Sequence, residues 1–367
     1  MTPQSTALTM RCGLRTPPRC TLGRMSTFPP PPAVPRLTLT TLRDDARAMV
    51  EAGAVKIMRG VYLQPAPRLA PWEQLREATL ARAAAALHTH PSAVCLTHEA
   101  AAIAHGYTCL TTEPDIHIAV PKVPTGGRRP LPTLTYTAED GHTFRGRKVS
   151  LVRSTRLPRS EEVDVVDGLR VTNPLQTAVD CACDLPAREA ICIVDSIFCK
   201  TCEADRFTRN CLGPTPEELR ATLLAMLERY PRRPGLRRAR AVLAIASPFS
   251  ESPGESILRW AVHAAGLPEA VPQLCWQSRE DSSTFFLDLG WEARKLDLEF
   301  DGYVKYGGSE DLRAEKSREM RLRRDGWRIE RFEWSEIKKP HELAARLTSL
   351  FPADVVRNAR PVRDLWL

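Results

Sequence analysis

The chain has 367 residues, 43% of them hydrophobic and 26% charged, and it carries a net charge of +8. This length exceeds one ordinary core and predicts two or three domains, and the composition excludes an intrinsically disordered chain. No apolar run reaches the roughly 18–20 residues that cross a membrane, whereas the excess of basic residues favours polyanions as partners.

Residues 1–36 differ in composition from the rest of the chain. They contain five arginines, many prolines and no acidic residue. They lack the continuous apolar segment of a secretory signal. Two interpretations stay open: a disordered basic tail, or an over-extended start with the true initiator at Met25.

Residues 37–64 have the outline of an abbreviated winged helix. A helical pattern runs over residues 42–52, and residues 54–63 predict two short strands around the Arg59-Gly60 turn. The segment before this hairpin leaves room for one helix rather than two. Lys56 and Arg59 lie in the hairpin and are candidates for contacts with DNA phosphates.

Residues 55–200 predict a mixed α+β unit. Pro71 begins a long alanine-rich helix, with proline in the first turn where its missing N–H is harmless. Strands are expected at 93–97, 116–120, 149–153 and 163–166, and helices at 99–105, 174–183 and 186–199. The eleven cysteines lack the spacing of a disulfide framework. This usage is typical of the reducing cytoplasm, where we expect the protein.

Residues 201–248 predict an arginine-rich helical linker region. Its basic cluster contains Arg232, Arg233, Arg237, Arg238 and Arg240. Such a cluster is interpreted either as a solvated helix face or as a set of contacts with DNA phosphates.

Residues 249–350 predict a separate α/β domain. Ser252 and Glu255 fit a capping box that opens a helix, which ends at Gly266. Strands are expected at 285–291, 295–302 and 327–332, with a helix at 310–325 between the last two. The predicted order is α-β-β-β-α-β, and residues 351–367 are expected to form a C-terminal tail.

The strand at 296–301 carries alternating carboxylates. Leu296, Leu298 and Phe300 are expected to face the core, which places Asp297, Glu299 and Asp301 together on the other face. Asp288 adds a fourth acid from the preceding strand. Carboxylate oxygens at such positions hold Mg²⁺ or Mn²⁺, and the candidate ligands are Asp288, Glu299 and Asp301. The alternative is a half-exposed strand with a solvated acidic face.

This C-terminal domain resembles the very-short-patch-repair-like branch of the PD-(D/E)xK nuclease superfamily. The matching stretches are residues 254–256, 286–289, 298–302, 315–319 and 326–329. The resemblance implies a restriction-endonuclease-like mixed sheet, metal-dependent cleavage of duplex DNA, and catalytic roles for Glu255, Asp288 and Glu299. Asp301 occupies the position of the family's basic residue, so Lys316 or Lys305 would have to supply that charge.

The region at 37–200 is similar to the AbiEi antitoxin family of transcriptional regulators. The matching stretches are residues 59–62, 96–102, 117–121 and 166–174. This resemblance implies a winged helix that binds operator DNA, and a cognate toxin as partner. Two hypotheses follow: a DNA-binding regulator whose nuclease fold is retired, or a Mg²⁺-dependent DNA endonuclease. A protein-binding antitoxin that acts without DNA is a third.

Overall fold

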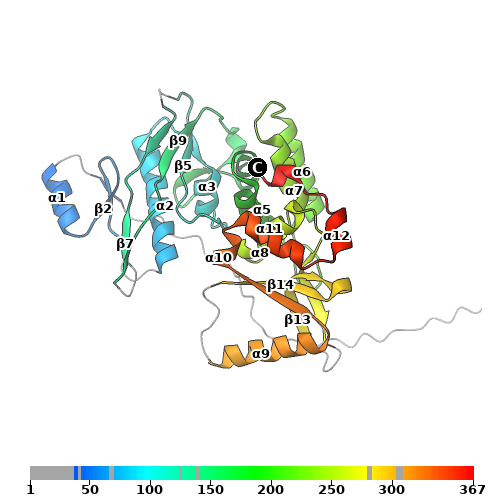
Figure 1. Cartoon of the computed structure of the whole chain (residues 1–367). Coiled ribbons are helices and arrows are strands. Elements are labelled where there is room, and N and C mark those ends of the chain that lie inside the picture. The colour runs from blue at the N-terminus through cyan, green and yellow to red at the C-terminus, as the bar shows by residue number, and fades with distance from the viewer. Residues whose placement is uncertain are drawn as a thin grey trace, which may run out of the picture.

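The computed structural model describes residues 37–39, 43–65, 70–123, 126–137, 141–278, 283–302 and 309–367. The expected basic tail at 1–36 and the candidate cation Lys305 lie outside these ranges. The protein is a mixed α/β molecule with several sheets (Figure 1). Among the described helices, none is both long and apolar enough to traverse a bilayer.

A small three-stranded sheet forms the N-terminal part of the described chain. Strand β1 (Leu37–Leu39) is followed by helix α1 (Arg43–Glu51), and strands β2 (Val55–Met58) and β3 (Val61–Leu63) form an antiparallel hairpin. The strand order is β1-β3-β2. Gly60 has a φ of 73° in the turn, a conformation that glycine adopts without strain. The described residues thus contain one helix before the hairpin, as the sequence predicts.

A six-stranded sheet forms the centre of the molecule, in the order β10-β11-β4-β5-β9-β6. Its strands are β4 (Cys95–Thr97), β5 (Ile116–Ala119), β6 (Arg128–Pro130), β9 (Ser150–Ser154), β10 (Val163–Val166) and β11 (Leu169–Thr172). Helices α2 (Pro71–Thr89) and α3 (His98–Ala104) pack against it. A separate hairpin pairs β7 (Thr135–Thr137) with β8 (Thr143–Arg145).

Four helices form a layer beyond this sheet: α4 (Pro174–Asp184), α5 (Ala187–Cys202), α6 (Pro216–Glu228) and α7 (Leu236–Ile245). The side chain of Asn173 accepts a hydrogen bond from the Gln176 N–H and caps α4. Leu223 of α6 and Leu243 of α7 are buried in the same core as α4 and α5. The segment 201–248 therefore contains two helices, α6 and α7, that belong to a packed layer rather than to a bare linker.

The C-terminal elements follow the predicted order. Helix α8 (Pro253–Ala264) precedes strands β12 (Val271–Gln277), β13 (Thr284–Trp291) and β14 (Leu296–Asp301), then helix α9 (Ser309–Arg324) and strand β15 (Arg328–Glu333). The sheet order is β12-β13-β14-β15; the first three strands are antiparallel, and β15 runs parallel to β14. Strand β12 is the one strand of that order whose range the sequence had not indicated.

Residues 351–367, expected as a tail, are packed onto α8. They follow helices α10 (Trp334–Ile337) and α11 (Pro340–Ser349), and they contain α12 (Ala353–Asn358) and the short helix η3 (Arg363–Leu365). The indole N–H of Trp260 donates to the Leu365 carbonyl at 2.8 Å, and that of Trp366 donates to the Ala264 carbonyl at 2.8 Å. The tail prediction is wrong, because these aromatic side chains complete the core around α8.

Candidate nucleic-acid interface and carboxylate cluster

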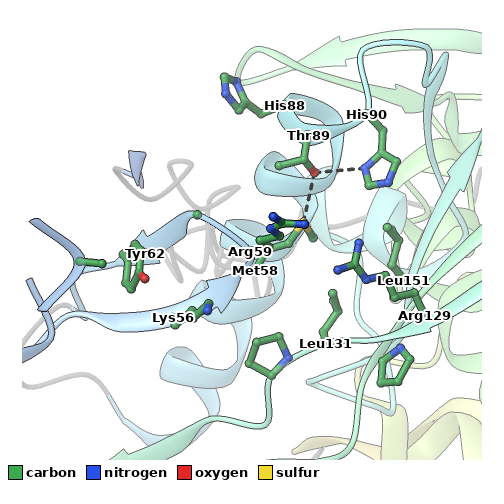
Figure 2. A pocket seen from close by; sticks show the side chains of 14 residues that line it. Lys56, Met58, Arg59, Tyr62, His88, Thr89, His90, Arg129, Leu131 and Leu151 are labelled. Carbon is green, nitrogen blue, oxygen red and sulfur yellow. Dashed lines mark hydrogen bonds between the residues drawn. The ribbon is translucent and has the colours of Figure 1, made fainter. Parts of the chain in front are cut away.

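A basic cleft of about 1250 Å³ lies where the β2–β3 hairpin, the end of α2 and strand β6 meet. The Thr89 hydroxyl donates to the Met58 sulfur at 3.1 Å and so joins α2 to the hairpin (Figure 2). The side chains that surround the cleft include Lys56, Met58, Arg59, Tyr62, His88, Thr89, His90, Arg129, Leu131 and Leu151.

Three exposed cations give the cleft its charge: Lys56 and Arg59 from the hairpin and Arg129 from β6. Within the described residues, no acidic side chain lines the cleft. Figure 2 shows Arg59 and Arg129 extending into the same space from different elements. The structure therefore places both hairpin residues predicted from the sequence in one basic cleft.

Arg129 completes this cleft and was missed by the sequence interpretation. Its signal is the Arg128-Arg129-Pro130 run, which forms an edge strand of the central sheet. A proline and exposed arginines are typical of edge strands. Nothing in that run indicated that the edge would lie beside the hairpin.

The arginine cluster on and before α7 divides into buried and exposed members. Arg233 is paired with Asp180 and Asp184, each at 2.9 Å, and its side chain is only 5% exposed. Arg238 donates to the Cys183 carbonyl, and Arg240 pairs with Glu228 at 2.8 Å. Arg232 is exposed, and the Arg237 side chain is 84% exposed. Only these last two present their charge largely to solvent, on a surface separate from the basic cleft.

The acidic face of β14 is buried rather than solvated. Asp297 is 0% exposed and Glu299 is also buried, so both faces of the strand are covered. The Arg318 guanidinium, from α9, donates to Glu299 at 2.5 Å and to the Phe286 carbonyl at 2.7 Å. The alternation of β14 correctly placed the leucines in the core, but its opposite face lies under α9 and forms an internal ionic layer.

A second arginine joins this layer from β15. Arg331 lies 3.4 Å from Glu299, 3.8 Å from Asp301 and 2.7 Å from Glu315. The parallel register places Arg331 directly beside Glu299. Lys316, the predicted cation, is exposed on α9. The cations that contact Glu299 are thus Arg318 and Arg331, which the sequence interpretation had not selected.

Glu255 lies in the capping box at the start of α8. Its carboxylate accepts hydrogen bonds from the Ser252 hydroxyl at 2.8 Å, the Glu251 N–H at 2.9 Å and the Gln273 side chain at 3.1 Å. Burial, followed by the charge of Asp288, raises the pKa of Glu255 to about 8. Glu255 and Asp288 are therefore electrostatic neighbours.

Asp288 and Asp297 connect Glu255 to Glu299 electrostatically. Asp288 accepts a hydrogen bond from the Phe300 N–H at 3.0 Å. Burial and the charges of Glu299 and Asp288 raise the pKa of Asp297 well above its ordinary value. Neither oxygen of Asp297 has a hydrogen-bond partner among the described residues. The four carboxyl groups thus form a chain of neighbours, Glu255, Asp288, Asp297 and Glu299, which we call the carboxylate cluster.

Two of the three candidate metal ligands are paired with arginines in this arrangement. Glu299 and Asp301 both interact with Arg331, and Glu299 also binds Arg318. Across the described part of the chain, no group of three or more acidic, histidine or cysteine side chains is arranged to hold a metal. Binding of an ion by Glu299 would therefore require displacement of an arginine.

The chain matches one family model over part of its length. Residues 92–229, from β4 to the end of α6, match the AbiEi antitoxin C-terminal domain. This match confirms the predicted resemblance for that stretch, whereas residues 37–91 and 230–367 lie outside it. No curated protein and no solved structure matches the chain, and the resemblance of residues 249–350 to nucleases has no support from these comparisons.

Proposed function

We propose that the protein is a DNA-binding regulator of the AbiEi antitoxin type. The observation that carries this proposal is the basic cleft, in which Lys56, Arg59 and Arg129 converge without an acidic neighbour among the described residues. Phosphate contacts supply most of the non-specific affinity of such proteins for DNA. The match of residues 92–229, which begin after α2, to an AbiEi antitoxin domain supports the regulator proposal.

The hairpin and the helix before it supply a mode of DNA contact. Helix α1 leads directly into β2, and its Ala46 lines the same cleft as the hairpin cations. A winged helix inserts a helix in the major groove while its hairpin contacts the backbone. We assign these two tasks to α1 and to the β2–β3 hairpin, and we expect a cognate toxin as the protein partner.

Salt-dependent binding of duplex DNA tests the proposal. Each phosphate contact contributes about −0.9 to the slope of log K against log salt. The double substitution Lys56→Ala, Arg59→Ala should weaken binding of every duplex and make the slope less negative by about 1.8. Lys122→Ala, an exposed cation outside the cleft, is the matched control. If the full chain binds no duplex even at about 50 mM salt, the regulator proposal is wrong.

Metal-dependent DNA cleavage is the second candidate function. One observation favours it: the buried, unpartnered carboxyl of Asp297 beside Asp288 and Glu299, which a cation would stabilise. In this candidate Asp288, Glu299 and Asp301 are the ligands of Mg²⁺ or Mn²⁺, and Lys316 or Lys305 is the phosphate-facing cation. Calorimetry with each ion and incubation with supercoiled plasmid test it. If neither ion binding nor nicking is observed, the nuclease candidate is wrong and only the regulator proposal remains.

A further inference from the structure

A groove lies between elements of the central unit and the C-terminal elements that pack against it. It consists of two adjoining cavities of about 900 and 310 Å³, which share Trp72, residues 110–112, Ser252 and Trp334. Volumes of this size are typical of ligand sites. The wall on one side comes from α2, α5 and the loop at 107–112, and the other from the start of α8, the end of β14 and α10.

Two tryptophans lie on opposite walls of this groove. Trp72, in the first turn of α2, is 45% exposed. Trp334, at the start of α10, is half-buried, and its ring meets the Phe300 ring edge-on at 4.9 Å. That contact holds Trp334 in place, while Trp72 has an open face. A flat π-face on each wall suits planar rings, because aromatic stacking is tolerant of the identity of the ring.

Three cations of the larger cavity surround the tryptophans: Arg147, Arg188 and Lys338. A fourth cation, Arg76, lines the smaller cavity and donates to the Ile103 carbonyl at 3.3 Å. Arg147 and Lys338 are exposed, and none of the three has an acidic partner among the described residues.

Three carboxyls, Glu189, Glu251 and Glu255, also line the groove, and Glu251 is paired with Arg206 at 3.1 Å. The oxygens of Glu255 are occupied by its capping-box hydrogen bonds. Arg188 donates to the Lys338 carbonyl at 3.4 Å. Cations without a carboxylate partner beside aromatic rings form the arrangement that binds single-stranded nucleic acid, with phosphates on the cations and bases on the rings.

We propose that this groove binds one unpaired strand of nucleic acid, whose bases stack on Trp72 and Trp334 and whose phosphates contact Arg147, Arg188 and Lys338. The proposal deepens the proposed function, because it rests on nucleic acid as the ligand. It concerns a different surface from the basic cleft, where Lys56 and Arg59 lie. Since cations come from both walls, binding of the strand bridges the two units.

Fluorescence anisotropy on the full chain, with labelled single-stranded dT12 and a labelled duplex as probes, tests the proposal. Trp72→Ala should lower the affinity for dT12 by about 5- to 150-fold, the usual effect of one stacking side chain, and leave duplex affinity unchanged. Trp72→Phe retains an aromatic face and should keep most of the binding. The double substitution Arg147→Ala, Lys338→Ala should weaken dT12 binding and reduce its salt dependence.

Matched controls separate this groove from other surfaces. Phe207→Ala removes an aromatic side chain that is 61% exposed outside the groove, and it should leave dT12 affinity unchanged. Lys56→Ala with Arg59→Ala should weaken the duplex complex alone. Equal dT12 affinity in wild type and Trp72→Ala, or no dT12 binding by the wild type, overturns the groove proposal. Loss of duplex binding alone overturns only the regulator proposal.

Discussion

The Arg318 guanidinium lies 2.5 Å from the Glu299 carboxylate and holds α9 against β14. The same guanidinium donates to the Phe286 carbonyl on β13, so one side chain connects a helix to two strands. Its partner is buried beside Asp297, which has no hydrogen-bond donor of its own among the described residues. Arg318 is therefore the main compensating charge for a buried acidic layer.

Arg318→Ala should destabilise the protein by up to about 3–5 kcal/mol, because it removes the closer of the two arginines that compensate the buried Glu299 carboxylate. The free energy of unfolding in urea measures the effect. Arg323→Ala, which removes an exposed pair with Glu319 on the same helix, is the matched control and should cost at most about 1 kcal/mol. Equal losses in the two variants would contradict this account of the acidic layer.

The same variant separates a metal site from an internal ionic layer. With Arg318 removed, Asp297 and Glu299 repel each other, and a divalent ion that fits between them should restore stability. If the carboxylate cluster is only structural, the urea midpoint of Arg318→Ala stays unchanged when Mg²⁺ or Mn²⁺ is added. A rise of the midpoint with ion concentration, absent in the additional variant Glu299→Gln, would favour the nuclease candidate.

Arg233 and Arg237 should respond differently although they lie four residues apart. Arg233→Ala breaks a buried pair of ionic contacts with Asp180 and Asp184, so about 3–5 kcal/mol of stability should be lost. Arg237→Ala should leave stability nearly unchanged and, as one phosphate contact, reduce the salt slope of duplex binding by about 0.9. Urea unfolding and anisotropy measure the two effects. An unchanged slope would assign Arg237 to a solvated helix face.

Most of the helices and strands could be predicted because their signals, such as caps and alternating apolar residues, lie within short stretches of the sequence. The alternation of Leu296, Leu298 and Phe300 and the cap at Ser252 depend on neighbours along the chain, and each marks an element that the structure contains. Strand β12 was harder to predict, because Gln273 has a φ of 48° and interrupts an otherwise regular strand. The burial of the acidic face of β14 was missed because α9 covers that face, and the sequence of α9 alone does not show which surface it packs against.

The candidate sites were predicted less completely than the elements, for a related reason. Lys56 and Arg59 are adjacent to their own turn, so the hairpin brings them together. Arg129 reaches the same cleft only through the pairing of β6 with β9. Arg331 reaches Glu299 through the parallel register of β15, which no local pattern specifies. Long-range pairing therefore decided which cations complete each site.

The C-terminal residues should contribute measurably to stability. Trp366→Ala removes the indole hydrogen bond to Ala264 and an edge contact with Trp260 at 5.3 Å. The expected loss is about 2–3 kcal/mol, from one hydrogen bond and the buried part of the ring. Leu367→Ala is the control, because its exposed side chain can be shortened while its carbonyl still accepts from the Ala187 N–H. A thermal midpoint for Trp366→Ala equal to that of the control would show that the contacts of Trp366 do not contribute to stability.

Glu255 should make the protein less stable as the pH rises. Its pKa is raised from 4.5 to about 8 in the folded state, so the folded protein binds this proton more tightly than the unfolded chain. The stabilising contribution is full below about pH 4.5 and is lost as the pH rises through 8. Glu255→Gln keeps an acceptor in the capping box but cannot ionise. Compared with wild type, this variant should therefore gain stability between these two pH values, by on the order of 3–5 kcal/mol at most.

Urea unfolding of wild type and Glu255→Gln at half-unit steps of pH measures this difference, and other titrating groups cancel because both proteins share them. Asp288→Asn is a second check, since the charge of Asp288 is the next largest cause of the shift after burial. That variant should lower the pKa of Glu255 and make the pH dependence shallower. Parallel stability curves for wild type and Glu255→Gln would mean that Glu255 titrates normally, and the electrostatic link between α8 and the carboxylate cluster would then be wrong.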